Sequence, residues 1–63
     1  MLTSAEGTRV RAIKAKLLAG KKVPAADAQW VLNMIAREQL PVRPAVVANA
    51  QRAGFSTVGI VTL

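Results

Sequence analysis

The chain contains no cysteine, no histidine and no tyrosine, and only one tryptophan and one phenylalanine. Without cysteine it forms neither a disulfide nor a thiolate metal site, and without histidine it lacks the commonest metal ligand and general base. We therefore expect no metal, no cofactor and no small-molecule substrate. Residues 1–63 are enough for one small domain with a thin core, which favours stabilisation by a partner or by homo-oligomerisation.

Acidic residues are also few, and the three that exist are scattered along the chain. Asp27 and Glu38 stand eleven residues apart on one predicted helix, which separates them by roughly 16 Å along its axis. Carboxylate pairs that act as acid and base lie about 5 to 9.5 Å apart. Neither Ser4 nor Ser56 has a histidine to activate it. We therefore predict that the protein is not an enzyme.

Long hydrophobic runs are missing as well. The longest uncharged stretch, residues 53–63, has 11 residues, whereas a membrane-spanning helix needs about 20. The N-terminus lacks the apolar segment of a secretory signal. We expect no contact with a membrane, and we predict a cytoplasmic protein or, for a virus, a virion protein. The residues fit a small bacterial protein and a small viral protein equally.

The hydrophobic residues, 52% of the chain, recur at helical spacing and predict three helices. The first covers about residues 4–19 and begins with the capping-box spacing of Thr3 and Glu6. Its buried stripe comprises Val10, Ile13 and Leu17. The second covers about 24–40 and is apolar on nearly every side, which is typical of a central helix. The third covers about 44–53.

Residues 56–63 are rich in β-branched side chains and form either a strand or an ordered tail over the helices. A lone strand would need an edge from another molecule, and we expect such pairing. The predicted fold class is thus mainly α: a small three-helix domain with a C-terminal β-strand or extended tail that pairs intermolecularly. Trp30 is expected in the core or, alternatively, at an interface. The predicted interface residues are Trp30, Met34, Val58 and Ile60.

Nine lysine and arginine residues give the chain a net charge of +6, and this charge is concentrated in one segment. Residues 9–22 hold six cations and no acid, while the rest of the chain is neutral overall. The segment either keeps an apolar protein soluble or binds a polyanion, and the lack of interleaved acids favours the second interpretation. The six cations are Arg9, Arg11, Lys14, Lys16, Lys21 and Lys22.

Residues 40–55 read Leu-Pro-Val-Arg-Pro-Ala-Val-Val-Ala-Asn-Ala-Gln-Arg-Ala-Gly-Phe, followed by the strand-like tail. This stretch resembles the turn and recognition helix of helix-turn-helix and winged-helix DNA-binding domains, and the tail resembles the strand that leads into a wing. The resemblance implies that Val47 and Ala50 are buried on the recognition helix. It also implies that three polar residues face DNA: Arg43, Asn49 and Arg52.

Two functions of different classes follow from these patterns. The first is a non-enzymatic, basic nucleic-acid-binding protein of the helix-turn-helix type, such as a regulator, with the first helix on phosphates and the third in a groove. The alternative is a small assembly or adaptor protein, such as a bacteriophage virion component or an inhibitor of a host protein. In that alternative the apolar second helix and the tail dock on protein partners.

Overall fold

The computed structural model describes residues 2–62, which form three α-helices. Helix α1 comprises Ser4–Leu18, α2 comprises Ala25–Glu38, and α3 comprises Pro44–Arg52. The prediction of a mainly α, three-helix domain is confirmed. The helix ends lie within two residues of those predicted, and Pro24 precedes α2 as its N-cap rather than occupying its first turn.

Both ends of α1 are fixed by residues whose roles can be read from the sequence. The Thr3 hydroxyl accepts a hydrogen bond from the Glu6 N–H at 3.1 Å, and the Glu6 carboxylate accepts one from the Thr3 N–H at 3.0 Å. At the other end, Gly20 adopts a φ of +73° and donates its N–H to Leu17 O at 3.1 Å. This conformation favours glycine, which has no Cβ atom, so the chain turns here with little steric strain.

Helix α2 ends in a strained backbone conformation. Gln39 has a φ of +53°, the left-handed region in which a Cβ atom costs about 1–2 kcal/mol. The turn is held because the Leu40 N–H donates to Ile35 O at 3.0 Å and Pro41 prevents the helix from continuing. Residues 39–43 then lead directly into α3.

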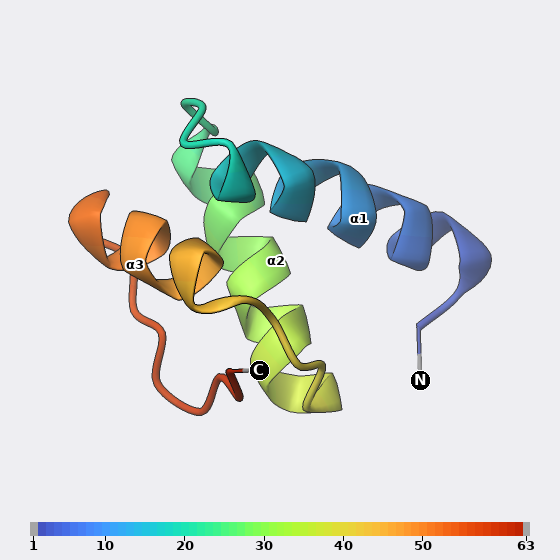
Figure 1. Cartoon of the computed structure of the whole chain (residues 1–63). Helices are drawn as coiled ribbons and strands as arrows, with labels where there is room; N and C mark the ends of the chain where they lie inside the picture. The colour runs from blue at the N-terminus through green and yellow to red at the C-terminus, as the bar shows by residue number, and fades with distance from the viewer. Residues whose placement is uncertain (1, 63) are drawn as a thin grey trace.

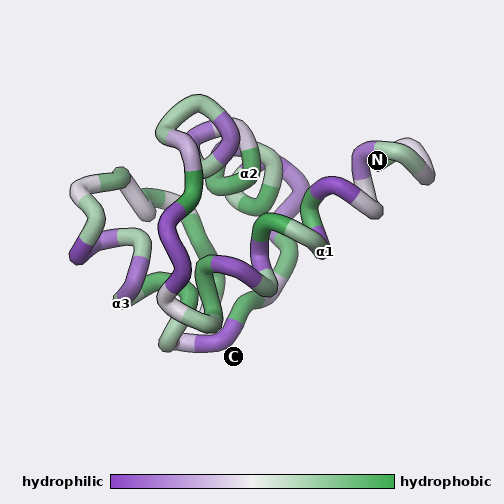
Figure 2. Tube along the Cα trace, turned by 90° about the horizontal axis from the view of Figure 1, so that it is seen from above, coloured by the Kyte–Doolittle hydropathy of each residue, from purple (hydrophilic) through white to green (hydrophobic). Residues whose placement is uncertain are grey.

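One core joins the three helices. Helix α1 packs against both α2 and α3, and the C-terminal ends of α1 and α3 lie on the same side of the molecule (Figure 1). The N-terminal end of α1 extends beyond the other two helices (Figure 2). The predicted stripe on α1 is buried, and α2 contributes more buried residues to the core than either of the other helices. The core comprises Val10, Ile13, Leu17, Val31, Leu32, Met34, Ile35, Val42, Val46 and Ala50.

The prediction of a C-terminal strand is not supported over residues 56–62, and Leu63 lies outside the described residues. Gly59, with a φ of +83°, breaks the extended run, and the Ile60 N–H closes a turn onto Thr57 O at 3.2 Å. The tail instead returns over its own chain, where a single parallel bridge joins Val42 and Thr62. The alternative of an ordered tail over the helices is the one that the structure adopts.

None of the helices within residues 2–62 is long and apolar enough to cross a membrane.

Candidate nucleic-acid interface

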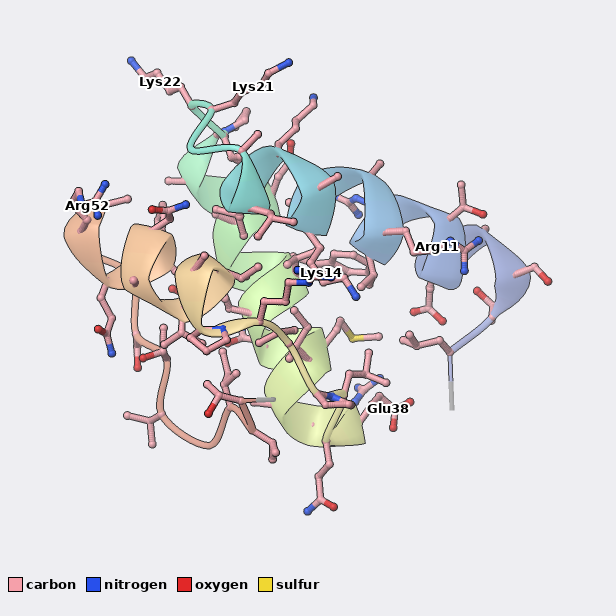
Figure 3. All side chains as sticks on the ribbon, in the orientation of Figure 1. Arg11, Lys14, Lys21, Lys22, Glu38 and Arg52 are labelled. Atoms are coloured by element: carbon pink, nitrogen blue, oxygen red, sulfur yellow. The ribbon has the colours of Figure 1, made fainter. Side chains whose placement is uncertain are left out.

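A cavity of about 500 Å³ lies where the α1–α2 loop meets the end of α3. Lys21 and Lys22 come from the loop and Arg52 from the last turn of α3, and all three side chains are exposed. Figure 3 shows the three on the same side of the molecule. We call Lys21, Lys22 and Arg52 the loop cluster. The cavity lining contains no acidic residue.

The backbone around the loop cluster also favours an anion. Pro24 and Ala25, at the N-terminus of α2, line the cavity, and no side chain caps the helix there. The positive end of the α2 dipole therefore faces this region. The C-terminal end of α1, which would oppose an anion, has its carbonyls engaged, because Leu17 O accepts hydrogen bonds from within the chain.

Asn49 provides one of those hydrogen bonds. Its Nδ2 donates to Leu17 O at 2.7 Å and lies 3.4 Å from Leu18 O, so the half-buried amide ties α3 to the end of α1. The helix-turn-helix resemblance places this residue against DNA, but in the folded chain its amide nitrogen is held by α1. The neighbouring buried positions on α3 are Val46 and Ala50, while Val47 is half-buried.

A second set of cations lies on the other flank of α1, beside the α2–α3 connection. Arg11 and Lys14 extend from α1, and Arg43 precedes α3; these three residues are called the groove cluster. They line a groove of about 340 Å³ whose remaining walls are apolar. Lys14 emerges between α1 and the connection (Figure 3). Six of the eight predicted cations thus lie in two separate clusters.

Arg9 belongs to neither group. Its Nη2 donates to Asp27 Oδ1 at 2.9 Å, and its guanidinium lies 4.3 Å from the centroid of the Trp30 ring. These contacts join α1 to the first turns of α2. Lys16, the last of the six cations of residues 9–22, is exposed and lines neither the cavity nor the groove.

The predicted interface residues are placed differently from one another. Met34 is 5% exposed and belongs to the core of its own chain, and Trp30 and Ile60 are half-buried against that core. Val58 is 87% exposed. Of these four side chains, Val58 is therefore the one most available to another molecule.

None of the three acidic residues lines the cavity, although Asp27 lies in the first turn of α2, two residues after the cavity-lining Ala25. Glu6 is at the start of α1, where the hydrogen bond from the Thr3 N–H holds the pKa of its carboxyl below the ordinary value of 4.5. Asp27 is paired with Arg9. Within residues 2–62 no three potential metal-ligating side chains come together.

Two residues of the site, Leu18 and Phe55, are not among those predicted from the sequence. Leu18 lies outside the buried stripe of α1 and is 43% exposed on the groove. Phe55, at the start of the tail, is half-buried and lines the cavity next to Arg52. Helical spacing does give a signal for Leu18: it stands four residues after Lys14 and therefore on the same face of α1 as that predicted cation.

Comparisons of the chain with models of protein families, with curated proteins and with solved structures find no match.

Proposed function

We propose that the protein is a non-enzymatic nucleic-acid-binding protein that holds the phosphate backbone with its loop cluster. The observation that carries the proposal is the meeting of Lys21, Lys22 and Arg52 around one cavity whose lining holds no acidic residue. These residues are separated by about 30 positions in sequence, and the packing of α1 beside α3 brings them together. Exposed ammonium and guanidinium groups are the usual partners of phosphate oxygens.

The remaining surface of α3 favours contacts with phosphates over reading of bases. Its exposed positions include Ala45, Ala48, Gln51 and Arg52, and the Gln51 amide already donates to Thr57 Oγ1 at 2.9 Å. Alanine carries no hydrogen-bonding group for a base edge. Binding of the helix-turn-helix type, with α3 as the helix that meets the groove, would thus have a large sequence-independent part.

A duplex fits this surface better than a single strand does. Proteins that hold single strands stack successive bases on aromatic side chains. Of the two aromatic residues of the chain, Trp30 does not line the cavity. Phe55 does, but it is half-buried and packs against the core, so the loop cluster offers no row of exposed rings for successive bases. The Trp30 ring is in addition covered by the Arg9 guanidinium. We therefore propose double-stranded nucleic acid as the ligand.

The test is a fluorescence anisotropy titration of a labelled duplex of about 20 base pairs, two helical turns, at low salt. One variant carries Lys21→Gln, Lys22→Gln and Arg52→Gln. The matched control carries Arg11→Gln, Lys14→Gln and Arg43→Gln, so both variants lose three positive charges. We expect the loop-cluster variant to weaken binding by about 10-fold or more, and the control to weaken it several times less.

Two results would count against this function. If the unaltered protein does not bind duplex at low salt, the protein is not a nucleic-acid-binding protein. If the two variants weaken binding equally, the loop cluster is not the site of contact, and the net charge alone accounts for the affinity. Circular dichroism of both variants checks that the helices are retained.

A further inference from the structure

The groove on the other flank of α1 has a chemistry that differs from the loop cluster. One wall is the face of α1 that carries Arg11, Lys14 and Leu18, residues spaced three, four and seven apart and hence on one side of the helix. The opposite wall is the α2–α3 connection with the exposed Arg43. Between the cations the lining is apolar: Ala15, Leu18, Pro41, Val42 and Val46.

The groove also carries exposed apolar surface. The large hydrophobic residues exposed within residues 2–62 are Leu18, Val58 and Val61. Leu18 is in the groove itself. Val61 adjoins it, because Val61 O accepts a hydrogen bond at 3.1 Å from the N–H of Val42, which lines the groove. Leu18 thus lies among the three cations of the groove cluster, and the backbone of Val61 is bonded to a residue of the groove lining.

We propose that this groove binds an acidic amphipathic helix of a partner protein. The apolar face of such a helix would cover Leu18 and the groove floor, as in helix-in-groove recognition. Its carboxylates would meet Arg11, Lys14 and Arg43 at the rim, because the groove lining holds no acid of its own. Charge complementarity therefore selects an acidic partner, and the exposed leucine selects an amphipathic one.

Other occupants fit the groove less well. A nucleic-acid backbone offers phosphates but no apolar side chain to cover Leu18. A second copy of this chain has no acidic segment, since its three acids stand at positions 6, 27 and 38. Asp27 is bonded to Arg9, and Glu6 closes the capping box of α1. The proposal does not depend on nucleic-acid binding, because it uses a different set of cations; together the two sites would make the protein an adaptor.

The test uses a labelled synthetic peptide with leucines at helical spacing and glutamates on the other face. Two control peptides separate the contributions: one replaces the leucines with serine at unchanged charge, and one replaces the glutamates with lysine. We expect saturable binding of the first peptide to the full chain, and a loss of about 10-fold or more for each control peptide.

Variants then locate the site. Leu18→Ser, at an exposed position that leaves the core intact, is expected to weaken peptide binding about fivefold or more. The Lys14→Gln, Arg43→Gln variant is expected to weaken it similarly, whereas Lys21→Gln, Lys22→Gln, with the same charge loss, should change it less than twofold. Amide chemical shifts of the 15N-labelled protein should move mainly at residues 11–18 and at residues 42, 43, 45 and 46, since positions 41 and 44 are prolines without an amide proton.

Each of three results would overturn the proposal. The first is absence of saturable peptide binding, and the second is equal binding of the serine control peptide, which would reduce the contact to charge. The third is that duplex, rather than peptide, shifts the amide signals of the groove residues, and that Arg43→Gln weakens duplex affinity as much as Lys22→Gln does. In that last case the groove is part of a nucleic-acid surface. Far-UV circular dichroism confirms that each variant retains its helices.

Discussion

Replacing Arg9 with methionine separates structural cations from cations available to a ligand. Methionine keeps much of the apolar stem but removes the ion pair with Asp27 and the contact with the Trp30 ring. The ion pair is exposed, with side chains 50% and 39% accessible, so it contributes about 0.2–1 kcal/mol. A cation over an aromatic ring at such a site adds about 0.5–1 kcal/mol. We expect Arg9→Met to lower the free energy of unfolding by about 1 kcal/mol.

For a domain of this size, about 1 kcal/mol corresponds to a fall in Tm of roughly 4–8 °C, measurable by circular dichroism. Trp30 fluorescence should change too, because the guanidinium over its ring is removed. The salt dependence of duplex affinity should stay the same. The matched control is Lys22→Met, which also removes one charge: it should leave Tm within about 2 °C and reduce the salt slope. An unchanged Tm together with a reduced salt slope for Arg9→Met would refute the assignment of Arg9 as a structural cation that does not contact the duplex.

Three further outcomes are expected from the structure. Gln39→Gly should raise the free energy of unfolding by up to about 1 kcal/mol in urea titrations, because it relieves the left-handed Cβ strain. The lowered pKa of the Glu6 carboxyl means that its charged form stabilises the fold above pH 4.5. This contribution is lost as pH falls through the lower folded-state pKa. On acidification, the Tm of the Glu6→Gln variant should therefore fall less than the Tm of the unaltered protein. Ile60→Ala should cost about 1 kcal/mol, whereas Val58→Ala, 87% exposed, should stay within about 0.5 kcal/mol.

The last pair also bears on the tail. If Val58→Ala destabilised the protein strongly, and more so at higher protein concentration, the tail would be packed against another molecule rather than over its own helices. Light scattering on the unaltered protein provides the check. A concentration-independent mass is the result that agrees with the fold of the single chain.

Features decided by local contacts could be predicted from the sequence. The capping box of Thr3 and Glu6 and the buried stripe of α1 follow from spacing alone, and the structure contains both. For the tail, β-branched residues favour extended backbone and leave both a strand and an ordered tail open; the turn at Gly59 and the packing of Ile60 decide for the tail. The left-handed Gln39 gives no signal, since glycine or asparagine usually occupies such a position.

The candidate site was predictable only in part, because its geometry depends on tertiary packing. The basic character of residues 9–22 is evident from composition, but the sequence does not divide these cations into groups. Lys22 and Arg52 line one cavity only because α1 and α3 end on the same side. Arg9 pairs with a residue 18 positions away, which no local pattern indicates.

The salt dependence of duplex affinity tests the central claim most directly. The logarithm of the association constant should fall linearly with the logarithm of salt concentration, by about 0.9 for each phosphate contacted. Removing the charges of Lys21, Lys22 and Arg52 should reduce that slope by up to about 2.7, three contacts at this value. An affinity that does not depend on salt, or a slope that the three substitutions leave unchanged, would contradict the account.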